Sequence, residues 1–514
     1  MATLSLDSGI ITRAREAANK IAIDVLKDIS QYTTTGVERA VLRLLGVEGE
    51  TSEGIPWVNV IVDDLLEKGL LDRGVAYWFV NGHIAEGLTL DTVASKVVNG
   101  EVDLSAVPSA NWTQVVEKMQ ALAMAGLEEI ERSKKKRDEM LARLGKGNEP
   151  LRYLIVATGN IHEDVIQAKA AVRQGADIIA VIRHTAQSLL DYVPADMNIE
   201  GVGGTIANRQ NFRIMRQALD ELAEDVGRYI FLTNYCSGLC MAEMAVLGSL
   251  ERLDVMLNDS MYGVIFRDIN AVRTFIDQHF SRAILAYAGI TINTGEDNYL
   301  TTADAFDKAH TVLASQFINE QFALLSGLKH SQIGLGHAFE ISPKLEDSFL
   351  YELAQAQMIR QIFPDSPIKY MPPTKYMTGN IFQGNVQDAL FNAVSIITGQ
   401  SIHLLGMPTE AIHTPHIHDR YLSLLNVDYI FGSLRHLGEE IQFASHGRIE
   451  QRADRVLSNA VEMLEEVACI GLMEAISRAM FADIARKPDG GKGLSGVIKK
   501  ADSYLNPFME LLKH

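Results

Sequence analysis

The sequence predicts an α/β fold, a (β/α)8 TIM barrel with additional helical segments before and after it. Three observations predict this fold. Eight short apolar runs of strand length recur between about residues 151 and 410, amphipathic stretches separate them, and both ends of the chain show helical spacing of apolar residues. Strands that alternate with helices form a parallel sheet, and eight such units fit a closed barrel. An open doubly wound sheet is the competing fold.

The eight apolar runs have the length and the composition of buried strands. They span residues 153–159, 178–183, 228–235, 253–260, 289–295, 331–337, 368–374 and 401–407. Amphipathic helices are expected between them, for example over 163–174 and 303–326.

The two ends of the chain are predicted to be helical. Residues 10–29 contain no Pro or Gly, and 111–144 place apolar residues along one stripe, with Asn111 as N-cap and Gly145 after the last turn. One long helix is expected over 452–485, and a flexible loop over 487–496. We therefore expect an N-terminal helical accessory region (1–150), the barrel with its cofactor and substrate site (151–410) and a C-terminal helical accessory region (411–514).

Composition excludes several classes of protein. The 514-residue chain has a net charge of -18, which disfavours nucleic acid and anionic membranes as partners. No apolar run reaches the roughly 20 residues of a membrane-spanning helix, and the start of the chain lacks a signal-peptide pattern, so a cytoplasmic location is expected. Three cysteines in so long a chain do not make a disulfide framework.

Polar side chains follow most of the apolar runs, where a barrel carries its active site. They include Arg183, His184, Ser188, Ser237, Tyr262, Arg267, Glu296, Asp297, Asn298, His337, Lys369, Lys375 and Glu410. Arg183 with Ser188 suits a phosphate, because a guanidinium and a hydroxyl match its oxygens. Tyr262 suits stacking on a flat heterocycle. Arg267, Asp297 and Lys369 suit a zwitterionic amino acid.

Two other patterns are weak. His413, His416 and His418 have ligand types that zinc or iron would accept, but Pro415 interrupts any helix that would aim them together. The glycine run at 201–205 lacks the spacing of a dinucleotide fingerprint. No metal site is therefore predicted.

Long blocks of the sequence resemble one known family. The blocks NYCSGLC, LERLDVMLNDSMYG, NTGEDNYLTTADAF, KAHTVLASQFINEQFALL, LGHAFE and KYMPPTKYMTGN are similar to the large subunit of lysine 5,6-aminomutase. The similarity runs from about Arg152 to beyond Glu410. Ornithine 4,5-aminomutase is the related family most easily confused with it, but its large chain is longer and also carries the cobalamin domain.

The resemblance implies an isomerase that uses pyridoxal 5'-phosphate and adenosylcobalamin in a radical reaction. The terminal amino group of D-lysine or L-β-lysine would move from C6 to C5, a step of lysine degradation. A smaller partner subunit would supply the D-x-H-x-x-G cobalamin motif, which this chain lacks, and the lysine that forms the Schiff base. The family also implies a heterotetramer, a dimer of heterodimers.

The resemblance also assigns roles to single residues. Arg183 and Ser188 would bind the phosphate, Ser237 would face the pyridine nitrogen, and Tyr262 would stack on the ring. The polar wall that meets substrate and cofactor oxygens would be Arg267, Asp297, Asn298 and Lys369. Glu410 would approach the adenosyl ribose. A serine cannot enforce a charge on the pyridine nitrogen as an aspartate does, and a neutral ring suits radical chemistry better than a carbanion.

Two alternatives remain. A self-contained pyridoxal phosphate enzyme of the racemase or decarboxylase type would use a lysine of its own, Lys369 or Lys375. A non-catalytic scaffold is the other class, and the ring of ionisable groups argues against it. The sequence does not distinguish D-lysine from L-β-lysine as the preferred substrate.

Overall fold

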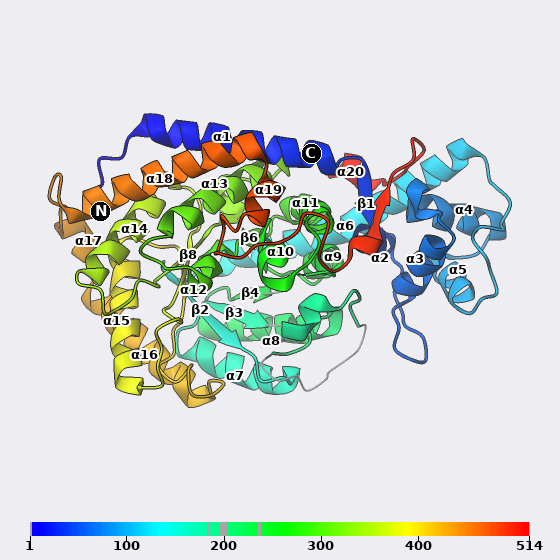
Figure 1. Cartoon of the computed structure of the whole chain (residues 1–514). Coiled ribbons are helices and arrows are strands. Elements are labelled where there is room, and N and C mark those ends of the chain that lie inside the picture. The colour runs from blue at the N-terminus through cyan, green and yellow to red at the C-terminus, as the bar shows by residue number, and fades with distance from the viewer. Residues whose placement is uncertain (1–2, 182–184, 195–203, 235–237, 513–514) are drawn as a thin grey trace.

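A parallel β-barrel forms the centre of the molecule (Figure 1). The computed structural model describes residues 3–181, 185–194, 204–234 and 238–512. The barrel strands are β2 (Leu151–Val156), β3 (Ile178–Val181), β4 (Phe231–Asn234), β5 (Val255–Leu257), β6 (Thr291–Asn293), β7 (Ile333–Gly334), β8 (Gly336–Ala338), β9 (Lys369–Met371) and β10 (Ile402–Leu404). β7 and β8 are two halves of one strand interrupted at Leu335, so the nine segments make eight barrel positions.

Closure distinguishes this barrel from an open sheet. Every neighbouring pair is parallel, β7 pairs with β6 and β8 with β9. The first and last strands also pair, with Ile402 opposite Leu151 and Leu404 opposite Tyr153. The barrel prediction is confirmed, and each strand lies within or overlaps one predicted run.

The register determines which side chains point into the barrel. A cluster of apolar residues fills the interior, made of Leu151, Tyr153, Ile178, Ala180, Ile402 and Leu404. Lys369 lies opposite Ile402 and therefore also points inward. His337, Tyr370 and His403 are in register with one another on the other face of the sheet. There the rings of Tyr370 and His403 pack against Phe391 of α15 (Ile381–Ile397), and His337 stacks on Tyr370.

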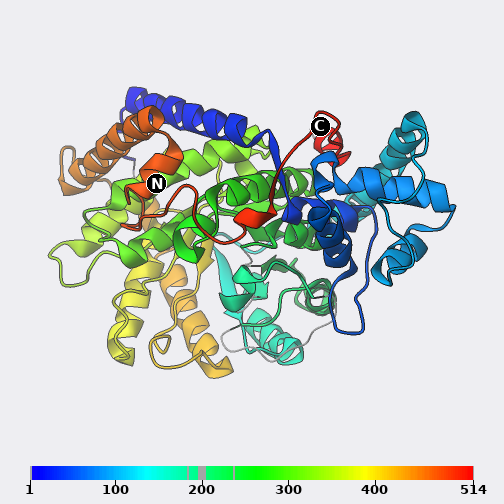
Figure 2. The same cartoon turned by 45° about the vertical axis from the view of Figure 1, so that its right-hand side comes forward.

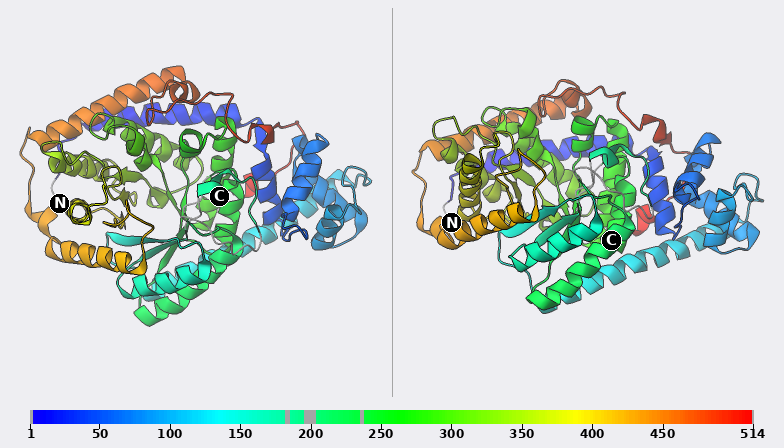
Figure 3. Two further views of the ribbon diagram at one scale, coloured as in Figure 1. Left: turned by 60° about the horizontal axis from the view of Figure 1, so that its bottom comes forward. Right: turned by 90° about the horizontal axis from the view of Figure 1, so that it is seen from below.

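Helices cover the outside of the barrel (Figure 3). They are α7 (Ile161–Arg173), α8 (Arg209–Val226), α9 (Met241–Leu250), α11 (Ala271–Ala288), α13 (Ala309–Leu325), α14 (Ser348–Ile362), α15 (Ile381–Ile397) and α16 (Ile417–Ser433). Four short elements lie at the carboxyl ends of strands: η2 (Thr185–Leu189), α10 (Tyr262–Arg267), η3 (Glu296–Asn298) and α12 (Tyr299–Thr302).

The N-terminal segment is helical. Its helices are α1 (Ser8–Ile29), α2 (Thr35–Leu44), α3 (Trp57–Glu67), α4 (Val75–Glu86), α5 (Leu90–Val98) and α6 (Trp112–Leu144), with strand β1 (Tyr32–Thr34) between α1 and α2. Of these helices, α3, α4 and α5 project to one side of the barrel, while α1 lies across it (Figure 2). The capping prediction for α6 is confirmed, because the Asn111 side chain accepts from the Thr113 amide and Gly145 ends the helix with a positive φ of 71°.

The C-terminal segment corrects one expectation. The helix predicted over 452–485 is instead α18 (Arg448–Ile470) followed by the short α19 (Leu472–Ser477). Gly471 separates them with φ of 91°, a left-handed conformation that favours glycine and ends a helix. The other elements of this segment are α17 (Leu437–Glu440), η5 (Leu494–Gly496), β11 (Val497–Lys499) and α20 (Phe508–Leu511).

The two ends of the chain meet on the barrel. α1 lies along α18 and α13, and β1 pairs antiparallel with β11, as Figure 1 shows across the top of the molecule. One hydrophobic core runs from Leu4 to Leu512. The domain boundaries at 150 and 410 stay a prediction. None of the helices in the described ranges is both long and apolar enough to cross a membrane.

Candidate functional site

A buried ion pair lies where two barrel strands end. Nζ of Lys369, on β9, is 2.9 Å from Oδ2 of Asp297, in η3 after β6, and both side chains are fully buried. The Lys369 ammonium also donates to the carbonyl of Thr294, at 3.0 Å. Burial raises the pKa of Asp297, and the neighbouring ammonium opposes that rise. Two predicted site residues from strands far apart in the sequence are thus in direct contact.

Asn298 completes this contact from the other side. Its backbone amide and its side-chain Nδ2 both donate to Oδ1 of Asp297, at 3.1 and 3.0 Å. The same Nδ2 donates to the carbonyl of Gly295. Asp297 is therefore held at both oxygens, and its orientation is fixed before any ligand arrives.

Tyr262 and Arg267 form a second part of the same site. They begin and end α10, the short helix that follows β5. Nη2 of Arg267 donates to the Tyr262 hydroxyl at 3.1 Å, and the guanidinium carbon lies 5.4 Å from the centre of the ring. The ring is 5% exposed and packs on Gly295, where an added Cβ would come within 2.9 Å of it. Gly295 precedes η3, so this ring borders the loop that carries Asp297.

Asp259 joins these two loops and was not among the predicted site residues. Its Oδ1 accepts from the amide of Tyr262 at 2.7 Å, and its Oδ2 accepts from the amide of Gly295 at 2.9 Å. Nδ2 of Asn319, on α13, donates to the same Oδ2. The sequence did contain a signal, since Asp259 is an acidic residue near the end of the run 253–260. It was counted as part of the predicted strand, whereas β5 ends at Leu257 and Asp259 follows it.

Glu296 is the neighbouring buried carboxyl. Its side chain is fully buried, and burial with the nearby Asp259 carboxylate raises its pKa well above the usual value. Burial and Asp259 therefore favour the protonated form of Glu296 beside the Asp297–Lys369 pair.

Ser188 lies at the end of β3, in η2, and its side chain is fully buried. The amide of Leu239, after β4, donates to its carbonyl at 3.2 Å. Gly238 has φ of 133°, and a Cβ there would lie 2.0 Å from the Ser188 carbonyl oxygen. The loops after β3 and β4 therefore approach so closely that only glycine fits at position 238. Arg183 and Ser237 lie outside the described residues.

A buried charge network holds the loop that carries Ser188. Nη2 of Arg273, on α11, donates to Oδ1 of Asp191 at 2.9 Å and to the carbonyl of Leu239 at 3.0 Å. Nη1 of Arg39, on α2, donates to the same Asp191 oxygen at 2.6 Å. Burial alone would raise the pKa of Asp191, but Arg273 and Arg39 outweigh it and lower that pKa. An N-terminal helix therefore fixes a loop of the barrel mouth.

A cavity of about 710 Å³ lies behind that loop and away from the predicted site residues. Its lining includes Arg39, Asp63 and Asp191. Both acidic groups already pair with Arg39, so this cavity has no free cation among these residues to attract an anion.

Glu410 belongs to a separate acidic group around the ends of β8 and β10. Glu410 is exposed at the surface, yet desolvation of its carboxyl by neighbouring protein atoms, together with the nearby Glu340, raises its pKa to about 7. Burial also raises the pKa of Glu340 to about 7 and, with Glu410 nearby, that of Asp388 to about 8. Neither carboxylate oxygen of Asp388 has a hydrogen-bond partner among the described residues.

The remaining candidates are placed as follows. His337 does not point into the site, since its ring stacks on Tyr370 outside the barrel, and burial lowers its pKa to about 3. Lys375 donates to the carbonyl of Ala303 at 2.7 Å. His413 and His416 stack on each other with centroids 4.7 Å apart. No cluster of three or more potential metal ligands occurs in the part of the chain that the structure describes.

Comparison with known proteins covers the whole chain. Residues 4–511 match the family model described as the D-lysine 5,6-aminomutase TIM-barrel domain of alpha subunit. The chain is 54% identical over 509 residues to the lysine 5,6-aminomutase alpha subunit of Acetoanaerobium sticklandii, covering 99% of this chain and 98% of that one. It is 52% identical over 513 residues to the alpha subunit of the same name from Fusobacterium nucleatum, covering 100% and 99%.

A more distant similarity is to the D-ornithine 4,5-aminomutase subunit beta of Acetoanaerobium sticklandii. That protein is 28% identical over 366 residues, which cover 68% of this chain and 49% of that one. The sequence blocks that indicated the family are thus confirmed by full-length similarity, with both helical flanks included.

Proposed function

Because the chain belongs to the family of D-lysine 5,6-aminomutase alpha subunits, we propose that its barrel mouth binds pyridoxal phosphate, the adenosyl end of adenosylcobalamin and lysine. The chain is an aminomutase subunit, and an aminomutase is an isomerase. The proposed reaction moves the terminal amino group of D-lysine or L-β-lysine from C6 to C5. The buried Lys369–Asp297 pair, bordered by Tyr262 at adjoining strand ends, is the observation that carries this proposal.

The loops after β3 and β4 fit the phosphate of pyridoxal phosphate. Ser188 is a buried hydroxyl beside Gly238, and the space that a Cβ would fill at Gly238 is needed for the close approach of the two loops. Hydroxyls and backbone amides at strand ends are typical phosphate donors in barrels. We propose that Arg183 supplies the charge and Ser237 faces the pyridine nitrogen.

Tyr262 would support the ring of the cofactor. Arg267 holds its hydroxyl and Gly295 supports its ring, so the aromatic plane cannot turn freely. An aromatic side chain fixed in this way offers a flat, apolar surface at low entropic cost.

The Lys369–Asp297 pair would receive the charged groups of the amino acid. A buried ion pair is costly to open, because each charge loses its partner. A zwitterion avoids that cost, since its carboxylate meets the Lys369 ammonium and its ammonium meets Asp297. We assign Arg267 and Asn298 to the same polar wall. A substrate without both charges would leave one buried group unpaired and would bind poorly.

Bound adenosylcobalamin supplies a carbon radical for hydrogen abstraction, and pyridoxal phosphate supplies a conjugated ring that carries the migrating nitrogen. The chain's own residues orient these groups and exclude water from them. Glu410, with its pKa raised to about 7, is suited to exchange hydrogen bonds with ribose hydroxyls of the adenosyl group.

A smaller partner subunit would carry the corrin and the Schiff-base lysine in a dimer of heterodimers. The two best-placed lysines of this chain are already engaged, Lys369 with Asp297 and Lys375 with the carbonyl of Ala303. This favours a lysine from outside the chain over the self-contained alternative.

Turnover by the assembled enzyme tests the proposed function. We expect the chain with its partner and both cofactors to convert D-lysine or L-β-lysine to a product with its amine on C5, identified by mass spectrometry and NMR. Omission of either cofactor or of the partner should abolish the product. Conversion of neither substrate by the complete mixture would refute the assignment.

A further inference from the structure

Two barrel helices present an exposed apolar surface. Half of the large apolar side chains that are exposed in the described part of the chain fall between residues 381 and 429. We call this surface the α15–α16 face, and it consists of Ile381, Phe382, Val386 and Leu390 on α15, Ile412, and Ile417, Tyr421, Leu422, Leu425 and Tyr429 on α16. Phe382 is 80% exposed and Tyr429 75% exposed.

Helical spacing places these residues on one side of each helix. Phe382, Val386 and Leu390 recur every four residues, as do Tyr421, Leu425 and Tyr429. The helices lie side by side, seen in yellow and gold in Figures 1 and 3. Asn426 of α16 links them by donating to Oδ1 of Asn385 at 2.9 Å and accepting from Nδ2 of Asn392 at 3.0 Å.

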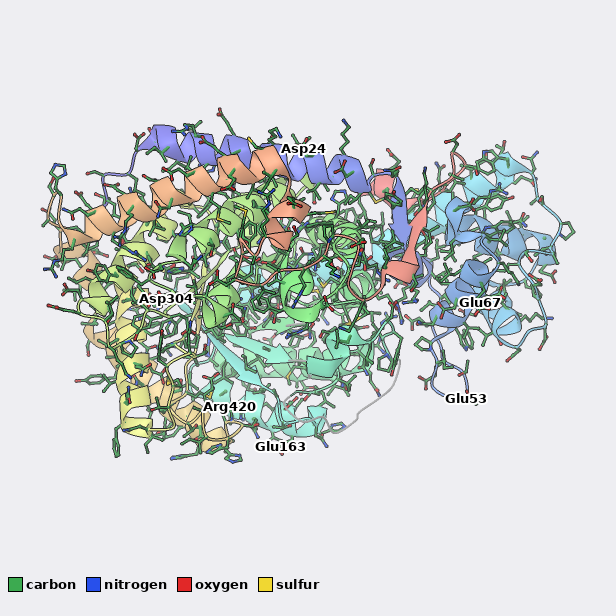
Figure 4. All side chains as sticks on the ribbon, viewed as in Figure 1. Asp24, Glu53, Glu67, Glu163, Asp304 and Arg420 are labelled. Carbon is green, nitrogen blue, oxygen red and sulfur yellow. The ribbon has the colours of Figure 1, made fainter. Side chains whose placement is uncertain are left out.

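The opposite sides of both helices pack on the barrel. Phe391 of α15 contacts Tyr370 of β9. Arg420 of α16, labelled in Figure 4, donates from Nε to the carbonyl of Ile155 in β2 at 3.0 Å. Core packing therefore accounts for the inner residues of these helices and not for the exposed ones.

Charge is sparse on the α15–α16 face, since the exposed acid of α16, Asp428, is paired with Arg152 at 2.7 Å. The chain has a net charge of -18, yet the sole ionisable residue of α15 is Asp388, which is 3% exposed and faces inward. Depletion of charge with enrichment of aromatic residues marks the centre of protein interfaces. An ordinary solvated helix would carry charges on its outer side.

The size of this face matches a stable interface. Its ten side chains expose roughly 1,000 Å², taking about 200 Å² for a fully exposed large side chain. The largest apolar patch of a typical monomer is about 300–600 Å², and a stable interface buries about 800 Å² on each partner.

The α15–α16 face continues into the barrel mouth. α15 follows β9 and α16 follows β10, and the connection before α16 carries both Glu410 and Ile412. A Cβ at Gly379, before α15, would lie 3.6 Å from Ile412, so the two connections touch. A protein that covers this face therefore also reaches the rim of the mouth beside Glu410.

We propose that the α15–α16 face is the docking surface for the smaller subunit of the enzyme. This inference rests on the proposed function, which requires a second subunit at the mouth. The complementary surface would have an apolar centre and a rim of Lys or Arg, because this chain is strongly acidic. Contact here would fix the partner at one edge of the mouth and leave the opening above Lys369 and Asp297 accessible to the cofactors.

The test compares charged substitutions on and off the face. Phe382→Asp and Tyr429→Asp should each weaken binding of the full chain to the small subunit about tenfold or more in calorimetric titration, and the double variant should no longer co-elute with it. Met124→Asp, at a 55% exposed apolar position on α6, is the matched control and should bind normally. Thermal unfolding of each chain alone should change little, since these side chains are mostly exposed.

Two further readouts separate the outcomes. Excess small subunit should restore the turnover of the single variants to the wild-type maximum, because neither residue touches the site. Wild-type affinity of both variants would overturn the inference, and so would a dimer of the isolated chain that Tyr429→Asp dissociates, since a second copy would then occupy the face. Failure of the proposed function gives a different result, in which the wild-type chain binds the small subunit but the assembly does not act on lysine.

Discussion

At the scale of single residues, the chemistry depends on the charge state of buried carboxyls. Asp297 is paired with an ammonium, whereas burial and the nearby Asp259 carboxylate raise the pKa of its neighbour Glu296. Two adjacent acids in the same 3-10 turn therefore have different roles, which their environments set.

We expect Asp297→Asn to suppress turnover by about two orders of magnitude or more, since the amide cannot neutralise the substrate ammonium or Lys369. Glu296→Gln is the matched control, and its effect should be small because burial and Asp259 favour the neutral form of this carboxyl. Steady-state assays with circular dichroism would measure activity and fold together. Full activity of Asp297→Asn would remove this residue from the polar wall.

Tyr262 is expected to act through its ring. Tyr262→Ala should weaken pyridoxal phosphate binding by about 1 kcal/mol or more, through loss of stacking. Tyr262→Phe should bind nearly as well, because it loses only the hydrogen bond to Arg267. Absorbance titration of the assembled enzyme gives both affinities, and equal binding by all three forms would place Tyr262 outside the cofactor site.

The acidic residues near Glu410 predict a pH dependence of stability. Burial raises the pKa of Asp388 from 3.8 to about 8 and that of Glu352 from 4.5 to about 8. Between these values the folded chain binds more protons than the unfolded chain. The free energy of unfolding therefore falls as pH rises through this window, by roughly a few kcal/mol.

The thermal midpoint should accordingly be lower at pH 9 than at pH 6. Asp388→Asn should reduce this difference, because the amide has no proton to lose and the carboxylate had no hydrogen bond to give up. Asp365→Asn, at an exposed position, should leave it unchanged. A pH profile of Asp388→Asn identical to that of wild type would contradict this account.

At the scale of elements, the loops after β3 and β4 are held from outside the barrel. Arg39 of α2 and Arg273 of α11 both bind Asp191, three residues after Ser188. The N-terminal helices thus help to shape the proposed phosphate site.

We expect Asp191→Asn to weaken the binding of pyridoxal phosphate roughly tenfold, while binding of pyridoxal without its phosphate changes little. The comparison isolates the phosphate loop from the rest of the site. Asp63→Asn, which removes the other carboxylate partner of Arg39, is the control and should spare both affinities. An equal loss for both ligands would show general damage instead of a role in positioning this loop.

The positions of helices and strands show which parts of the fold can be predicted from the sequence. Strand runs and the Asn111 cap follow from local patterns, so their positions were predicted. The break at Gly471 was missed because a single glycine within a helical pattern is often tolerated, and only its positive φ reveals a helix end. His337 was placed in the site because a difference of one residue in register moves a side chain to the other face of the sheet.

At the scale of the whole molecule, the closure of the barrel and the contacts between distant strands determine which residues meet at the candidate site. Periodicity predicted eight strands, but the pairing of β10 with β2 that closes the barrel depends on distances. The types of the residues at the strand ends were readable from sequence. The direct contact of Lys369 with Asp297 and the role of Asp259 in joining two loops were not, because they depend on how strand ends 36 or more residues apart are aligned.

We propose that this chain binds pyridoxal phosphate while another subunit supplies the lysine that attaches it. Borohydride reduction of the assembled enzyme with bound pyridoxal phosphate, followed by peptide mapping, tests it most directly. We expect a pyridoxyl group on a lysine of the small subunit, none on this chain, and weaker labelling when Ser188 is replaced by alanine. A pyridoxyl group on Lys369 or Lys375 would contradict it and would make the self-contained enzyme the correct description.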